Sequence, residues 1–466
     1  MSTEPQTTQP SSAPNQREWD IVIFGATGDS GEAMATYIAN NVDHYKKPNG
    51  GSTGDDRFRW AIAGRSEHKL NRLKSRLIVG RLRPSSNDEI GVLFADLASA
   101  EELNDLAKST RVLISAVGPY TVLGESVYAA CVENGTNYVD ITAEVDWVTK
   151  MRKKYRDRAT ETGATLCSFA GYDSVPGDIS IYAARKALSE YDKDENISLS
   201  SAETVFVLGG KSPLPRGTLR TMITKMGDFM AFSSSLGRFA PSKDAQWRTR
   251  LALMRWLLPR WSPEYGAFTY PHFMGWCNIP VLYNSCSSLD CIYHDRLAIP
   301  FSQDSPANGY GILPASIFCF FQVITAPLFL CFQVLVTFIP GAADLLLKIV
   351  DGLQYRANTK ENQQQMRSAT VDTWTFVTSS SGSKAEVHLH VNGDAGLICT
   401  ALLAIETAFS MLMLLDEDKL PRGVIGSPSM IVADALVARL QDEETIGDEC
   451  TLSVTVSDND NKKKKE

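Results

Sequence analysis

Three closely spaced glycines have the pattern of a phosphate-binding turn. Gly25, Gly28 and Gly31 stand in the sequence Gly-Ala-Thr-Gly-Asp-Ser-Gly, which follows the apolar run 20–24 and precedes a helical stretch at about 32–42. Such glycines permit a tight turn, let backbone amides approach a pyrophosphate, and let the helix pack closely on the strand. The helix N-terminus then faces the anion. We expect a dinucleotide to be bound by Gly25, Ala26, Thr27, Gly28, Ser30 and Gly31.

The next strand-like run ends in Ala-Gly-Arg-Ser, with Arg65 and Ser66 as its last two residues. A protein that binds NAD usually carries an acidic residue here for the ribose hydroxyls, whereas an arginine suits a 2′-phosphate because its charged fork is planar. We therefore predict NADP(H) in preference to NAD(H), with Arg65 and Ser66 at the 2′-phosphate. The alternative for Arg65 is a solvated charge in a loop.

Two later turns follow strands at the sheet edge where open α/β folds bind ligands. Asp96 follows the third strand-like run and is predicted to contact the adenine side of the cofactor, with capping of the next helix as the alternative. The turn after the fourth run is predicted to line the nicotinamide pocket through Ala116, Val117, Gly118 and Pro119.

Hydride transfer from a nicotinamide often needs one proton donor from the protein. The candidates near the same edge are Tyr120, Tyr172 and Asp173, and either tyrosine would protonate a reduced enoyl or carbonyl product. The structural alternatives are a packed aromatic ring for each tyrosine and a turn for Asp173. No metal site is expected, because the spacing is not that of zinc knuckles in the group His272, Cys277, Cys286, Cys291 and His294.

Alternating strand-like and helical stretches must position these residues. The strand-like runs 58–63, 91–94, 111–117, 138–141 and 165–168 predict an α/β fold with a doubly wound, parallel Rossmann sheet. We assign residues 18–180 to this NADP-binding domain. Residues 181–305 and 346–455 are assigned to a second, α+β domain for substrate binding or dimerisation, so a homodimer is one expected form. In it, runs 371–376 and 384–391 predict an antiparallel hairpin, and a helix is expected at 399–415.

Residues 305–343 contain no Asp, Glu, Lys or Arg. Pro327 divides this stretch into two arms of roughly a dozen residues, whereas a straight span needs about twenty apolar residues. The arms therefore favour a hairpin that enters one leaflet, with buried helices of a soluble core as the alternative. We predict that residues 306–345 interrupt the second domain and anchor the chain to a membrane or lipid droplet.

The composition bears on partners and compartment. The net charge of −8 argues against nucleic acid as a partner, since phosphate binding needs surplus Lys and Arg. The composition of residues 1–17 predicts a disordered tail without a secretory signal. Residues 456–466 are predicted to form a polar basic tail. In that tail Lys463 and Lys464 match a dilysine retrieval signal, with a solvated charge run as the alternative. Nine scattered cysteines predict reduced thiols. We expect the cytosolic face of lipid droplets or the endoplasmic reticulum, with mitochondrial or other membranes as alternatives.

Together these motifs give the chain a resemblance to the saccharopine dehydrogenase-like oxidoreductases. It resembles their eukaryotic branch, which is related to the trans-acting enoyl reductases of mycobacterial glycolipid synthesis. The matching motifs are GATGDSG at 25–31, WAIAGRS at 60–66, SAVGPY at 115–120, YVDITAE at 138–144 and GYDSVPGD at 171–178. One departure is Ala143, where the family usually has a glycine. The resemblance implies association with lipid droplets and membranes.

The leading interpretation is a membrane- or droplet-bound NADP(H)-dependent oxidoreductase that reduces a lipid or lipid-linked acyl substrate. One alternative is a cytosolic saccharopine-type amino-acid dehydrogenase, which would need clustered basic residues for several carboxylates and would not use a long uncharged segment. The other is a scaffold or sensor at a lipid surface that binds NADP(H) without catalysis.

Overall fold

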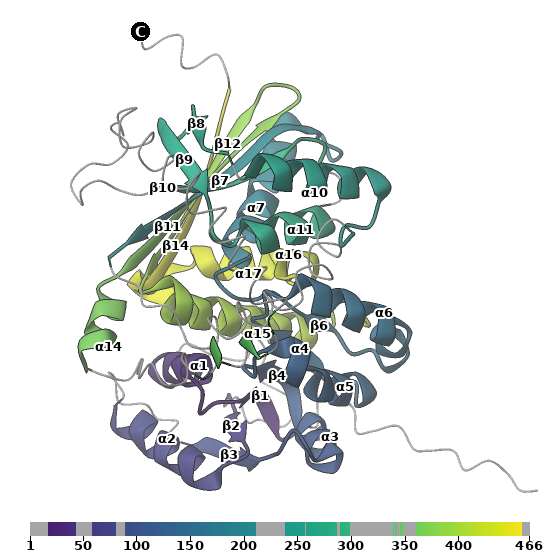
Figure 1. Ribbon diagram of the computed structural model, residues 1–466, viewed down its shortest axis with the longest axis vertical. Helices are drawn as coiled ribbons and strands as arrows, with labels where there is room; N and C mark the ends of the chain where they lie inside the picture. Colours follow the sequence, from purple (N-terminus) through teal and green to yellow (C-terminus); the bar gives the residue numbers. More distant parts are fainter. Residues whose placement is uncertain are drawn as a thin grey trace, which may run out of the picture.

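The computed structural model describes residues 17–42, 58–80, 89–210, 238–256, 258–286, 289–298 and 360–458, with six isolated positions between 339 and 348. These residues build two seven-stranded sheets, one at the bottom and one at the top of Figure 1. Residues 1–16, nearly all of the predicted anchor 306–345, and residues 459–466 lie outside the described residues.

The first sheet has the order β13-β6-β5-β4-β1-β2-β3, and all its pairings are parallel. Its strands are β1 (Trp19–Phe24), β2 (Trp60–Gly64), β3 (Ile90–Phe94), β4 (Thr110–Ser115), β5 (Asn137–Asp140), β6 (Leu166–Cys167) and β13 (Ile425–Gly426). The predicted doubly wound parallel sheet is confirmed. β13 comes from the chain range assigned to the second domain, so the C-terminal part of the chain completes the first sheet.

Helices cover both faces of this sheet, which explains why its central strands β1 and β4 are buried almost throughout. Ile21 and Ile23 of β1 face one core with α1 and α15 (Thr400–Asp416), while Val22 and Phe24 face the other core with α3, α5 and α6. The helices of this part are α1 (Asp29–Asn41), α2 (Glu67–Val79), α3 (Ala100–Ser109), α4 (Tyr120–Leu123), α5 (Glu125–Glu133) and α6 (Val145–Thr162). Arg17 is buried beside the sheet and donates to the Thr110 and Asn134 carbonyls, so the described fold begins within the predicted tail.

The second sheet has the order β14-β12-β11-β7-β10-β9-β8. Only β7 and β10 pair in parallel. Its strands are β7 (Leu199–Gly209), β8 (Arg260–Ser262), β9 (Ala267–Pro271), β10 (Tyr293–Ala298), β11 (Thr370–Ser379), β12 (Lys384–Asn392) and β14 (Cys450–Ser457). The predicted hairpin is β11 and β12. Their alternating burial places one face against α7 (Val175–Asp192) and leaves the other half-buried.

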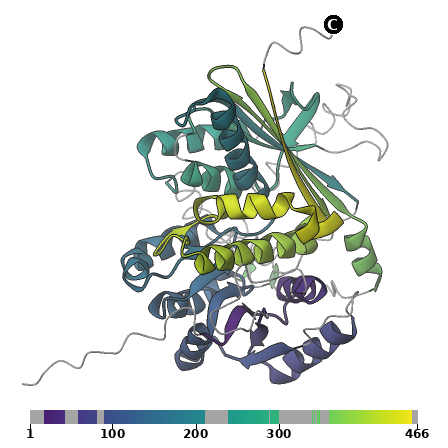
Figure 2. The ribbon, with the colours of Figure 1, turned by 180° about the vertical axis from the view of Figure 1, so that it is seen from behind.

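The remaining helices pack around and between the sheets. They are α10 (Lys243–Trp256), α11 (Gly275–Ser285), α14 (Lys360–Arg367), the π-helix η3 (Ala395–Cys399), α15 (Thr400–Asp416), α16 (Pro428–Ile431), α17 (Ala433–Gln441), α18 (Glu443–Ile446) and the 3₁₀ turn η4 (Gly447–Glu449). Figure 2 shows α15 and α17, in yellow-green and yellow, side by side between the two sheets.

The continuous helix Ala395–Asp416 confirms the helix predicted at 399–415. Among the described residues it is the only helix long and apolar enough to cross a membrane, but 83% of its apolar window is buried inside the protein. Glu406, near its middle, accepts hydrogen bonds from Tyr37 of α1 and Arg439 of α17. These contacts identify it as a core helix that joins the two halves of the molecule.

Candidate functional site

The glycine turn joins β1 to α1 at the carboxyl edge of the first sheet. Its first amide, that of Gly25, donates to the Ala63 carbonyl of β2, and the Gly28 amide donates back to the Gly25 carbonyl. Gly28 is the N-cap of α1 and makes no side-chain cap bond. A helix N-terminus that begins at a glycine, beside a folded-back turn, is the arrangement that receives a phosphate.

Two of the glycines are required by space. Gly25 has φ +82°, and a Cβ there would lie 2.6 Å from Val117 Cγ2. A Cβ on Gly31 would lie 2.4 Å from the Gly25 carbonyl oxygen, so the helix would be pushed off the turn. A Cβ on Gly28 would meet only the Gly25 oxygen, at 3.4 Å. This pattern matches the roles expected for the three positions: a tight turn, room for a ligand, and close helix packing.

Acidic residues at the start of α1 affect the charge near this turn. Asp29 and Glu32 lie in its first turn, where carboxylates are stabilised by the helix dipole. The Glu32 carboxylate is paired with Arg76 of α2 at 2.9 Å, so its charge is partly balanced. The backbone amides at the helix end, rather than side-chain cations, are therefore the groups that would hold the phosphates.

The other predicted cofactor residues follow the neighbouring strands at the same edge. Arg65 is exposed directly after β2, and Ser66 is the N-cap of α2 with no side-chain cap bond, so its hydroxyl does not serve the helix. Asp96 accepts from the Ala98 amide, while Ser99 caps α3. Ser99, and not Asp96, is therefore the N-cap of α3. The contact of Asp96 with the adenine side of the cofactor stays a prediction.

The turn after β4 lies against the glycine turn. The Ala116 amide donates to the Phe24 carbonyl, and Val117 touches Gly25. Gly118 and Pro119 follow, joined by a cis peptide bond. All the residues predicted from these two turns, 25–31 and 116–119, are therefore brought together at the switch between β1 and β4, where the sheet order changes direction.

Tyr120 lies close to this turn, but its hydroxyl is engaged inside the domain. It donates to the Ser115 carbonyl at 2.7 Å, and the ring packs on Trp147 with centroids 5.4 Å apart. Glu144, which is fully buried, accepts from the Tyr120 and Thr121 amides at 2.7 and 2.9 Å. Tyr120 is therefore a packed aromatic ring at the start of a helix that the Glu144 carboxylate holds. This is the structural alternative to a proton donor.

The other two candidates, Tyr172 and Asp173, lie in the segment between β6 and α7 that leads to the second sheet. Tyr172 is buried, and its ring packs edge-on against Phe206 of β7 and His272. Burial raises the pKa of Asp173 to about 6, and the nearby His272 acts in the opposite direction. Because β6 ends at the same sheet edge as the glycine turn, this group lies between the cofactor edge and the second domain.

His272 is the centre of a buried polar group that sequence reasoning did not assemble. Its Nδ1 lies 2.8 Å from Asp295 Oδ1, and both side chains are fully buried. Asp295 Oδ2 accepts from Asn278 at 3.1 Å and from the Tyr293 hydroxyl at 3.3 Å. Phe206 stacks on the imidazole with centroids 4.0 Å apart. The carboxylate thus holds the imidazole in one orientation.

Two polar atoms of this group have no hydrogen-bond partner among the described residues: Nε2 of His272 and the hydroxyl of Tyr172. A buried, unpaired polar atom is costly in a folded protein, and it often marks a site that a ligand or water completes. An imidazole held through Nδ1, with Nε2 unused, can give or take one proton at that atom. The group therefore has the chemistry of a proton donor.

Only weak signals for this group are present in the amino-acid sequence. His272 entered the analysis only through the cysteine and histidine spacing, while Asp295 lies 23 residues later on a different strand. In the structure Cys277 contacts the Ser174 hydroxyl, and His294 lies beside Arg260, so these members point to different neighbours. The alternation of side chains along β10 would have indicated only that Asp295 faces the protein interior.

A cavity lies beside α1. It has a volume of about 260 Å³ and lies between α1, α14 and the start of α15. Of the glycine-turn region it reaches only Asp29, the first residue of α1. It therefore adjoins the phosphate turn without covering it.

Comparison with protein families agrees with this geometry. Residues 21–167 match the family described as the saccharopine dehydrogenase NADP binding domain. The first domain is therefore similar to the saccharopine dehydrogenase NADP binding domain. This match spans β1 to β6, including both turns described above, and it confirms NADP(H) as the predicted cofactor.

Three curated relatives extend the comparison. A saccharopine dehydrogenase-like oxidoreductase of Mus musculus is 33% identical over 177 residues, which cover 38% of this chain and 40% of that protein. A lipid droplet localized protein of Caenorhabditis elegans is 35% identical over 168 residues, 36% of each chain. A Mycobacterium tuberculosis protein, named for a trans-acting enoyl reductase, is 27% identical over 436 residues, 91% of this chain and 96% of that protein.

The predicted resemblance is confirmed by these matches. The matched part spans two fifths or less of the mouse and nematode relatives, and nearly all of the mycobacterial one.

Proposed function

We propose that the protein is an NADP(H)-dependent oxidoreductase that reduces a lipid or lipid-linked acyl substrate. The observation that carries this proposal is the pairing of an NADP-binding edge with the buried His272 group beside it. The cofactor would supply the hydride, and the protein would supply orientation and one proton. The names of the nematode and mycobacterial relatives, a lipid droplet protein and an enoyl reductase, support a lipid substrate.

In this proposal each part of the site has a separate task. The amides of the glycine turn hold the pyrophosphate, Arg65 and Ser66 hold the 2′-phosphate, and the turn 116–119 bounds the nicotinamide. The proton comes from Nε2 of His272, with Asp295 as the positioning residue that holds Nδ1. Tyr172, whose hydroxyl has no partner among the described residues, is placed to hydrogen-bond the substrate oxygen or to relay the proton.

Cofactor binding and turnover test this proposal together. We expect the detergent-solubilised full chain to bind NADPH more tightly than NADH and to oxidise NADPH when offered enoyl- or keto-lipids. Fluorescence titration gives the two affinities, and loss of NADPH absorbance gives turnover. Tight binding without turnover on any such lipid would favour the scaffold or sensor, and failure to bind either nucleotide would refute both readings.

We also propose that residues 306–345 anchor the chain to a lipid droplet or to the endoplasmic reticulum on the cytosolic side. The support is the uncharged stretch 305–343 and the name of the nematode relative. Such an anchor would keep the enzyme at the lipid phase that holds its substrate.

Removing residues 311–339 should release the protein from lipid while the NADP-binding domain stays folded. We expect the full chain to float with phosphatidylcholine vesicles and the deletion variant to stay in the soluble fraction with its NADPH affinity unchanged. Deletion of residues 5–16, which like residues 311–339 contain no charged side chain, serves as the control. If the variant aggregates or no longer binds NADPH, the segment belongs to the protein core.

A further inference from the structure

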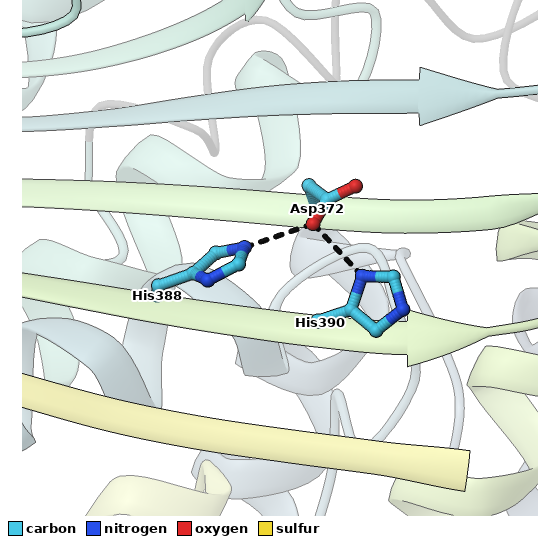
Figure 3. Close-up of side chains that lie close together, drawn as sticks. All are labelled: Asp372, His388 and His390. Atoms are coloured by element: carbon cyan, nitrogen blue, oxygen red, sulfur yellow. Dashed lines mark hydrogen bonds and ion pairs between the residues drawn. The ribbon is translucent and has the colours of Figure 1, made fainter. Parts of the chain in front are cut away.

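The half-buried face of the hairpin β11–β12 carries two histidines and an aspartate that meet (Figure 3). His388 and His390 are two residues apart on β12, so both side chains lie on the same face. Asp372 of β11 is directly opposite His390 in the strand register. The three side chains are between 26% and 29% exposed, so they are partly desolvated yet within reach of an ion from solvent.

The ligand atoms of the three side chains are close enough for one ion. Asp372 Oδ1 lies 2.8 Å from Nε2 of His388 and 2.8 Å from Nδ1 of His390, and all three atoms lie within 4.8 Å of one another. Ligands at about 2.0–2.2 Å in a tetrahedral zinc site are separated by roughly 3.3 Å, so shifts of less than about an ångström would form it. Imidazole and carboxylate together are ligands that Zn²⁺ and similar ions prefer.

Neighbouring side chains fix both rings in the required orientation. Trp374 stacks on His388 with centroids 3.7 Å apart and an angle of 7° between the planes. Asn392 donates its amide hydrogen to the Asp448 carbonyl, which leaves its Oδ1 facing Nε2 of His390 at 3.2 Å. His390 Nε2 is therefore a donor, and its Nδ1 is the nitrogen turned toward Asp372. A metal-binding histidine is usually held in this way, through its second ring nitrogen.

The charge of Asp372 suits the same role. Burial acts to raise its pKa, but the hydrogen bonds from His388 and His390 outweigh burial, so the pKa lies below the ordinary value. The carboxylate is thus ionised at neutral pH.

We propose that Asp372, His388 and His390 form a binding site for a divalent transition-metal ion of the Zn²⁺ class. Three protein ligands leave one position of a tetrahedral ion open for water or another ligand. The bound ion would join β11 to β12, and binding would release protons. The proposal is independent of the proposed oxidoreductase function, because these residues lie on the second sheet and belong to none of the cofactor or proton-donor groups.

Cobalt titration of the chelator-treated full chain tests the site, because Co²⁺ bound to nitrogen and oxygen ligands absorbs visible light. We expect one Co²⁺ per chain, displaced by Zn²⁺, with binding that weakens as pH falls because protons compete for the imidazoles. His388→Gln and His390→Gln should each weaken binding by at least about 100-fold, and Asn392→Ala by about 10-fold, since a supporting hydrogen bond contributes roughly 10- to 100-fold.

His68→Gln is the matched control, since His68 is exposed on α2. It should leave Co²⁺ binding unchanged, and NADPH affinity should be the same in all variants, which shows that each is folded. Unaltered Co²⁺ binding in both hairpin variants would overturn the proposal. So would the absence of stoichiometric binding to the wild-type chain, in which case the three side chains form only a hydrogen-bonded group.

Discussion

Replacing His272 with asparagine should lower kcat by about 10²- to 10⁴-fold, the range that a positioned general acid contributes. Asparagine keeps a side-chain amide that can donate to Asp295, but it carries no proton that can be transferred at the position of Nε2. His272 follows β9 in the second domain and is not one of the residues of the glycine turn. The affinity for NADPH should therefore stay within a factor of about two. Steady-state NADPH oxidation with the best lipid acceptor, together with a nucleotide titration, measures both quantities.

His294→Asn is the matched control for this change. His294 precedes Asp295 on β10, and neighbouring side chains on a strand point to opposite faces, so the control leaves the His272–Asp295 contact intact. We expect it to change kcat less than about threefold. Equal kcat in His272→Asn and wild type would remove His272 from the mechanism. A parallel loss of NADPH binding would show that the residue acts through the fold instead.

Asp295→Asn tests the positioning role within the same group. The amide can contact Nδ1 through its oxygen or its nitrogen, so His272 would no longer be held in one orientation, and kcat should fall while the KM for the lipid acceptor changes little. A merely structural role for Asp295 would change the amount of folded protein and leave kcat per folded chain in place. The two outcomes are distinguished by measuring kcat and KM per bound NADPH.

Strands β1 to β6 of the first sheet were predictable from sequence because their signals are local. Strands such as β1 and β4 are apolar on both faces, and each ends in a turn whose residues are restricted by backbone geometry, as at Gly25. Local patterns of this kind can be recognised in the sequence without knowledge of contacts between distant residues. β13 could not be predicted, because two residues, Ile425 and Gly426, are a strand only through pairing with β6.

The parts of the candidate site that could be placed from sequence are those that directly follow a single strand. The glycine turn follows β1 and Arg65 follows β2, so the parallel order of the strands puts both at the carboxyl edge of the first sheet. The pairs His272–Asp295 and Asp372–His390 arise from register between strands, and Asp372 lies 18 residues before His390 in the chain. The spacing of residues in the sequence does not show which of them lie opposite one another on neighbouring strands. Tyr120 illustrates the opposite case, since its position was expected but its hydroxyl is bound to Ser115 inside the domain.

Replacing Arg65 with aspartate should reverse the cofactor preference. A hydrogen bond to a charged group contributes about 1.5–3 kcal/mol, so loss of the arginine should weaken NADPH binding by roughly 10- to 100-fold. The new carboxylate repels a 2′-phosphate, and it can accept hydrogen bonds from the ribose hydroxyls of NADH. The ratio of NADPH to NADH affinity should therefore fall by at least about 100-fold, and much of the dependence of NADPH binding on salt should disappear with it.

Arg72→Asp makes the same change of charge at another exposed position, on α2. If the effect of Arg65 came from the overall field, both variants would lose NADPH affinity to a similar degree, and added salt would abolish the difference from wild type. A direct contact predicts that only the variant at position 65 changes the preference, because Arg65 follows β2 beside the glycine turn while Arg72 lies further along the helix. An unchanged preference in Arg65→Asp would place the 2′-phosphate elsewhere on this edge, with Ser66 as the next residue to test.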